Sequence, residues 1–143
     1  MNYNMATLKI SDLSVGDWVR WEVYDKTYDL QVSGVTDRRI YGLHDGIEYS
    51  MLLTQICSIP ITAEILKKNG WSTDGMYAFL RIDEHLHLEY YYHEHRLRKY
   101  FCGKDEWQNH AKVTDITFAA HCYSVHQLQH ALRLAGVDKE INL

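Results

Sequence analysis

Apolar and polar positions alternate with a period of two in short stretches along the first sixty residues. The clearest examples cover residues 18–23 and 28–33. Such alternation is typical of β-strands with one buried face. Turn residues separate the stretches, and Asp45-Gly46 is a strong signal for a tight hairpin. The pattern predicts five short strands, at residues 18–23, 28–33, 39–43, 48–52 and 56–61. Their number and spacing favour a small barrel of the SH3-like type.

A short helix is predicted directly after these strands. Thr62 is a good N-cap, Glu64 lies in the first turn, and Gly70 stands where a left-handed C-cap is needed. We expect this helix to close the barrel or to join the two halves of the chain.

Stretches typical of strands return after residue 76, at residues 77–82, 85–92, 97–102 and 116–123. A longer helix follows them, because Ser124 and Gln127 form a capping box and apolar residues then recur at helical spacing up to Gly136. This half of the chain predicts a three- or four-stranded antiparallel sheet with the last helix packed on one face.

Together these elements predict an α+β protein, with an N-terminal SH3-like small β-barrel followed by an antiparallel sheet with a packed C-terminal helix. The expected divisions are residues 1–61 for the barrel, 62–75 for a linking helix and turn, and 76–143 for the sheet and the last helix. A chain of 143 residues fits one ordinary domain, so the two halves can pack as a single body.

Composition and charge restrict the location and the partners. No stretch approaches the ~20 apolar residues of a membrane helix, and the first six residues lack the features of a signal peptide. Three scattered cysteines, Cys57, Cys102 and Cys122, fit a reducing cytosol and free thiols. The net charge of −4, with neither half basic, argues against a nucleic-acid partner. We therefore expect a cytoplasmic protein that does not contact a membrane.

One basic run, Arg-Leu-Arg-Lys at residues 96–99, interrupts this acidic chain. Four acidic residues lie near it in the sequence: Glu89, Glu94, Asp105 and Glu106. The sequence predicts a solvated turn whose charge is largely cancelled by these neighbours.

Nine histidines are the most unusual feature of the composition. On a strand, the side chains of His85, His87 and Glu89 point the same way, and two imidazoles with a carboxylate can hold zinc or a redox metal. The structural alternative is that they decorate the polar side of a strand whose Leu86 and Leu88 are core. A metal-binding protein or metal-dependent enzyme that uses this face is therefore one alternative.

Aromatic residues make up 13% of the chain. Tyr91 shares the strand face of Glu89, and Trp18 lies in the first predicted strand. Tyrosine supplies contact area at protein interfaces and can stack on single-stranded bases, although it is also favoured in strands. Tyr91 and Trp18 are thus candidate binding residues, for a protein partner or for self-association. Base stacking keeps a nucleic-acid-binding accessory protein as a second alternative.

Three stretches of the chain resemble segments of known proteins: residues 10–19 (ISDLSVGDWV), 59–70 (IPITAEILKKNG) and 125–129 (VHQLQ). In order and spacing the chain resembles a group of small uncharacterised proteins of gut anaerobic bacteria, their phages and mobile elements. The resemblance implies a cytoplasmic accessory protein, phage- or mobile-element-derived, and it transfers no catalytic or binding residue.

No phosphate loop, dinucleotide fingerprint or nucleophile elbow occurs in the sequence. We therefore expect a non-enzymatic binding protein that needs no cofactor and that holds a protein partner or a second copy of itself.

Overall fold

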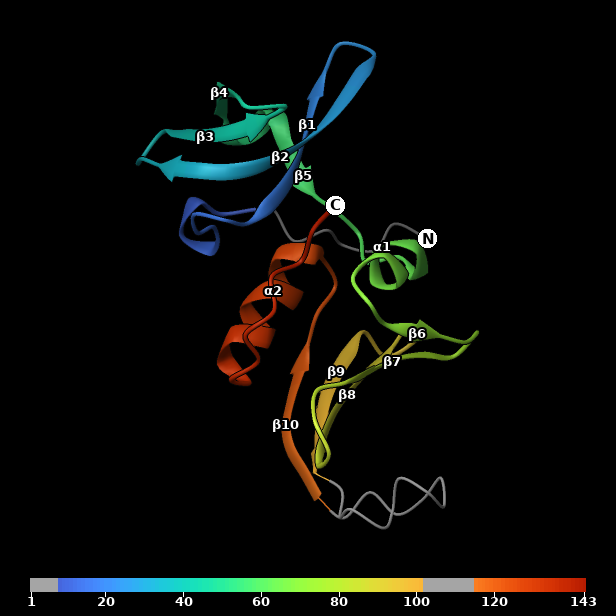
Figure 1. Cartoon of the computed structure of the whole chain (residues 1–143). Helices are drawn as coiled ribbons and strands as arrows, with labels where there is room; N and C mark the ends of the chain where they lie inside the picture. The colour runs from blue at the N-terminus through green and yellow to red at the C-terminus, as the bar shows by residue number, and fades with distance from the viewer. Residues whose placement is uncertain (1–7, 102–114) are drawn as a thin grey trace. The chain divides into compact units, whose positions relative to one another are not determined.

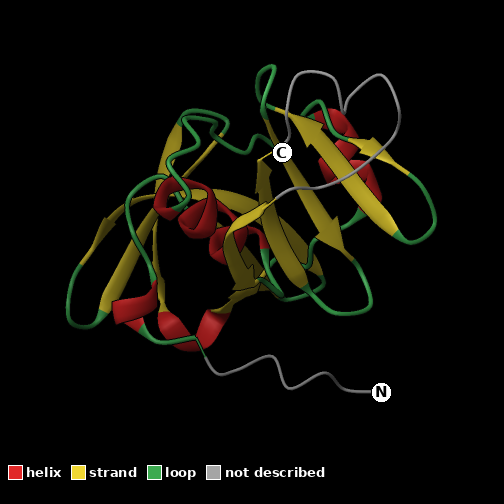
Figure 2. Cartoon of the chain, turned by 90° about the horizontal axis from the view of Figure 1, so that it is seen from below, coloured by secondary structure: helices red, strands yellow, loops and turns green. Residues whose placement is uncertain are grey.

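The computed structural model describes residues 8–101 and 115–143, and only the backbone of residues 115–117. Contacts divide the chain into two compact units, one of residues 1–60 with 124–126 and the other of residues 61–123 with 127–143. Each unit contains an antiparallel sheet of five strands within the described residues. Figure 2 shows how far strands outnumber helices, so the fold is mainly β rather than the predicted α+β.

The first sheet is an antiparallel arrangement in the order β4-β3-β2-β1-β5 (Figure 1). Its strands are β1 (Trp18–Val23), β2 (Lys26–Val35), β3 (Arg39–His44), β4 (Ile47–Leu52) and β5 (Ile56–Ser58). The Asp-Gly signal is confirmed, because Asp45 and Gly46 both have positive φ angles, 50° and 76°, in the turn between β3 and β4. Alternate side chains build one core of Leu13, Val19, Leu30, Val32, Ile40, Met51 and Ile56.

The five predicted strands are confirmed, but the predicted barrel is not shown. Two short 3₁₀-helices accompany the sheet, η1 (Ile10–Asp12) before β1 and η2 (Leu53–Gln55) between β4 and β5. A barrel closes only when its first and last strands pair. In the described part of the chain no ladder joins the edge strands β4 and β5, so the sheet is open there.

Helix α1 (Ala63–Lys68) follows the first sheet, as predicted. The Thr62 hydroxyl accepts a hydrogen bond from the backbone N–H of Ile65 at 3.2 Å, which is the expected N-cap. The helix is followed by Gly70, whose φ of +88° is the left-handed conformation that favours glycine. Leu66 is the fully buried residue of this helix.

The second sheet has the order β10-β9-β8-β7-β6, again antiparallel. Its strands are β6 (Ser72–Thr73), β7 (Tyr77–Arg81), β8 (Leu86–Tyr91), β9 (Arg96–Phe101) and β10 (Asp115–His121). The hydropathy pattern misses β6, because two residues are too short for a period to be visible.

Helix α2 (Val125–Leu134) begins directly after Ser124, as the capping box predicts. The side-chain hydrogen bonds at this helix start differ from those of a standard capping box. Gln127 Oε1 accepts a hydrogen bond from the backbone N–H of Tyr123 at 2.8 Å, and the Ser124 hydroxyl lies 3.0 Å from Nδ1 of His126. After Gly136, at φ +74°, the chain returns along the helix. No helix in the described residues combines the length and the apolar character that crossing a membrane would require.

Amide side chains hold this returning segment in place. The Gln129 side chain, 1% exposed, accepts the backbone N–H of Ile141 at 2.6 Å and donates to the carbonyl of Lys139 at 3.2 Å. Asn69 makes the same two-way contact with the backbone of Asn142, with both distances 2.8 Å. Each side-chain amide thus gives the backbone of this segment the donor and the acceptor that a neighbouring β-strand would otherwise provide.

Candidate functional site

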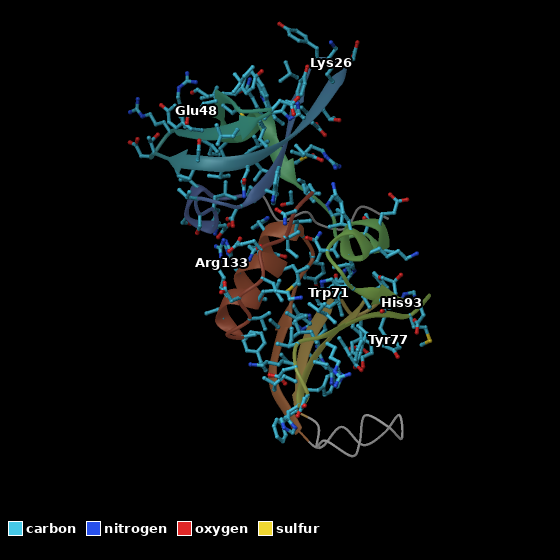
Figure 3. The ribbon with its side chains drawn as sticks, in the orientation of Figure 1. Lys26, Glu48, Trp71, Tyr77, His93 and Arg133 are labelled. Atoms are coloured by element: carbon cyan, nitrogen blue, oxygen red, sulfur yellow. The ribbon has the colours of Figure 1, made fainter. Side chains whose placement is uncertain are left out.

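The two faces of the second sheet differ in chemistry. One face is apolar and almost fully buried, and it includes Leu80, Leu88 and Leu97. Lys99, in register with Leu88, donates from Nζ to the carbonyl of Ala135, at 2.6 Å, just beyond α2. This face therefore packs toward α2, and Figure 3 shows Tyr77 on the opposite side of the sheet from the α2 residue Arg133.

The opposite face carries rings, guanidinium groups and a carboxylate. Directly paired residues of antiparallel strands place their side chains on the same face. The register of β7, β8 and β9 therefore groups nine residues, which we call the stacked face: Tyr77, Phe79, Arg81, His87, Glu89, Tyr91, Arg96, Arg98 and Tyr100.

The first of two stacks on this face runs across all three strands. The ring of His87 lies between those of Phe79 and Tyr100, with centroid distances of 4.9 Å and 5.0 Å and interplanar angles of 31° and 19°. His87 is 3% exposed. The imidazole is thus fixed by a ring from each neighbouring strand.

The second stack runs parallel to the first. Tyr77 stacks on Tyr91 with ring centroids 5.8 Å apart and 29° between the planes. The guanidinium of Arg98 lies 5.1 Å from the centroid of the Tyr91 ring, which is a cation–π contact. Neighbouring groups on both sides therefore hold the ring of Tyr91.

Glu89 joins the two stacks. Its Oε1 lies 3.4 Å from Nε2 of His87, and its Oε2 accepts a hydrogen bond from the hydroxyl of Tyr91. That hydroxyl also lies 3.3 Å from the hydroxyl of Tyr100. The polar atoms of four residues on two strands thus form one network.

This network shifts the pKa values of Glu89 and Tyr91. Burial alone would raise the pKa of Glu89, but the hydrogen bonds from His87 and Tyr91 outweigh burial and hold the pKa below its ordinary value. Burial and the hydrogen bond to Glu89 raise the pKa of Tyr91 above its ordinary value. At neutral pH Glu89 is therefore a carboxylate and Tyr91 a protonated donor, so the network is complete without any ligand.

The structure brings His87, Glu89 and Tyr91 together but separates His85 from them. His85 precedes β8 and stacks on Phe101, with 5.6 Å between the ring centroids. Within the part of the chain that the structure describes, no group of three or more His, Cys, Asp or Glu side chains is placed to hold a metal ion. The metal hypothesis rested on a face shared by His85, His87 and Glu89, whereas the two imidazoles stack on different rings, Phe101 for His85 and Phe79 and Tyr100 for His87.

The other candidate binding residue, Trp18, lies in the first unit. It is half-buried on β1, opposite Gln31 of β2. It shares the strand face of Arg20, which forms an ion pair with Asp29 at 3.0 Å. Nothing in this surrounding defines a site.

The sequence-based interpretation of residues 96–99 as a solvated turn is wrong. These residues lie within β9, with Leu97 fully buried and with Arg96 and Arg98 half-buried on the stacked face. Within the described residues the expected charge cancellation includes an ion pair of 3.4 Å between Arg98 and Glu94, and Asp105 and Glu106 lie outside these residues. The strand predicted over residues 97–102 is the interpretation that holds, and alternation around Leu97 places both arginines on one face.

Cysteine chemistry is not supported at the described positions. Cys57 and Cys122 carry free thiols, as predicted, and Cys102 lies outside the described residues. Burial raises the pKa of Cys122 to about 12 and also raises that of Cys57. A thiol nucleophile needs the opposite shift.

Comparisons of the chain with protein-family models, with curated proteins and with solved structures found no match.

Proposed function

We propose that this chain is a non-enzymatic binding protein that holds a protein partner on the stacked face. The observation that carries the proposal is the pair of cross-strand stacks joined through Glu89, which fixes half-buried rings and guanidinium groups before any partner arrives. Tyrosine and arginine are the residues that protein interfaces favour. A surface that is already ordered loses little conformational entropy on binding.

The ring geometry favours a protein over a single-stranded nucleic acid. Stacking of bases needs an accessible ring face. The ring of Tyr91 is instead held between Tyr77 and Arg98, and that of His87 between Phe79 and Tyr100. A partner therefore meets ring edges, hydroxyl groups and guanidinium N–H groups, which suit the polar contacts of a protein surface.

The proposal includes a finer description of the first unit and of the protein's setting. We propose that the first sheet is an SH3-like small barrel. The pairing of β1 with both β2 and β5 supports it, and so does the bulge between Val32 and Gly34, because a bulge bends a strand toward closure. We also propose that the protein is a cytoplasmic accessory protein of phage or mobile-element origin. The resemblance carried by residues 10–19, 59–70 and 125–129 suggests this role, and two free thiols are consistent with it.

Affinity capture from cells of the source organism tests the proposed function. The bait is the full chain, either unchanged, with Tyr77→Ala on the stacked face, or with Tyr41→Ala as a control in the first unit; both tyrosines are half-buried on strands. We expect a protein that the unchanged chain and Tyr41→Ala enrich and that Tyr77→Ala loses. Light scattering on the purified chain shows whether this protein is a second copy. Equal enrichment by all three baits, or no enriched protein, would contradict the proposal.

A further inference from the structure

We infer that the partner's contact segment is an acidic peptide segment, whose carboxylates bind Arg96 and Arg98; this inference rests on the proposed function. Both guanidinium groups lie on the stacked face, opposite Tyr91 and Glu89 in the strand register. Glu89 is the carboxylate of this face within the described residues, and it is already bonded to His87 and Tyr91. Among the described residues the face thus carries an excess of positive charge, although the chain as a whole is at −4.

The contacts of Arg98 leave it able to bind a carboxylate. A guanidinium that lies over an aromatic ring uses its π face, while its N–H groups lie in the plane of the group and point outward. Arg98 lies over Tyr91, and its N–H groups hydrogen-bond the side chain of Tyr100 and reach Oε2 of Glu94 at 3.4 Å. Glu94 is more than half exposed, so a partner's carboxylate can replace it.

Arg96 supplies a second cationic group at a suitable spacing. Its guanidinium lies 3.3 Å from Nε2 of His121, an exposed residue of β10. Residues two apart on a strand are about 7 Å from each other, which is also the repeat of alternate side chains in an extended peptide. Arg96 and Arg98 can therefore bind two acidic side chains of one extended segment, each with the fork geometry that suits carboxylates.

Phosphate groups also bind arginine, so the nucleic-acid alternative is part of the test. The probes are fluorescein-labelled octaglutamate, octalysine and octathymidylate, titrated with the full chain at low ionic strength and followed by fluorescence anisotropy. The variants are Arg96→Gln with Arg98→Gln, the matched control Arg133→Gln on α2, and Glu94→Gln. Arg133 is a suitable control because it also pairs with an exposed glutamate, Glu140, at 3.2 Å.

We expect octaglutamate to bind, and to bind about tenfold more weakly to the double variant, because each exposed charged contact contributes a modest amount. Arg133→Gln should leave the affinity unchanged, and Glu94→Gln should increase it by about twofold because it removes the competing carboxylate. Added salt should weaken binding. The gain in Glu94→Gln does not depend on the fold of the double variant, so it is an independent test of the inference.

Three results would overturn the inference: no binding of octaglutamate, equal affinity in the double variant and the unchanged chain, or tighter binding of octathymidylate than of octaglutamate. Capture of a partner that Tyr77→Ala loses, without any binding of octaglutamate, would reject the acidic segment and leave the proposed function standing. Failure of that capture would reject the proposed function itself.

Discussion

Replacement of Gln129 by leucine should destabilise the second unit more than any single surface change. The Gln129 side chain is almost fully buried and bonds both ways with the returning segment, through the N–H of Ile141 and the carbonyl of Lys139. Leucine fills a similar volume and removes both hydrogen bonds. The change therefore isolates the contribution of the polar contacts.

The size of the effect depends on whether each backbone group that loses its hydrogen bond to Gln129 can find another partner. Ile141 is 2% exposed, so its N–H stays buried without an acceptor, which costs about 1–3 kcal/mol. Lys139 is exposed, so water can satisfy its carbonyl and little is lost there. The apolar leucine offsets part of the cost. We expect a free energy of unfolding lower by about 2 kcal/mol.

Urea denaturation followed by circular dichroism measures this difference, and hydrogen exchange at the amide of Ile141 localises it. A suitable control is Gln55→Leu, because Gln55 accepts a backbone N–H from Leu52 at 3.0 Å in an exposed position. The control should change the free energy of unfolding by less than about 1 kcal/mol. A Gln129→Leu chain within about 0.5 kcal/mol of the unchanged protein would refute the reasoning.

Further expectations concern α1, the first core and a buried thiol. Thr62→Ala removes the N-cap of α1 and should lower the free energy of unfolding by about 1 kcal/mol in urea denaturation; an unchanged midpoint would refute the cap. Gly42→Ala places a Cβ 3.1 Å from the Cβ of Leu30 and 3.2 Å from Cε of Met51, so it should cost about 1–3 kcal/mol; a more stable variant would show that the core has room. Burial raises the pKa of Cys122 from 9.0 to about 12, so the stability that its protonated thiol contributes is complete below pH 9 and is lost as the pH rises toward 12. Urea denaturation between pH 9 and 12 should therefore show a smaller fall in the free energy of unfolding for Cys122→Ala than for the unchanged chain. An equal fall in both would contradict the shift.

The strands and the helix ends could be predicted from the sequence because their signals are local. A period of two, an Asp-Gly turn, and the N-cap at Thr62 each involve only a few neighbouring residues, and each is found where the sequence placed it. The open edge of the first sheet could not be predicted in this way. Closure would need β4 to pair with β5, and no short stretch encodes whether two distant strands pair.

The candidate site could be predicted only in part, because it depends on the register between strands. The sequence placed His85, His87, Glu89 and Tyr91 on one face of a strand, and the structure brings the last three of these together. The sequence did not reveal that Phe79 and Tyr100 enclose His87, because a shift of one residue in register would have moved those rings to the other face. The rings that favour the predicted binding surface over the metal alternative therefore come from the neighbouring strands.

The central claim is that the stacked face is the surface that holds the partner. Hydrogen–deuterium exchange of the full chain, alone and with the captured partner, tests this claim most directly. We expect slower exchange in β7, β8 and β9 on partner binding, and no such change in the chain with Tyr77→Ala. Slower exchange confined to the strands of the first sheet would contradict the account.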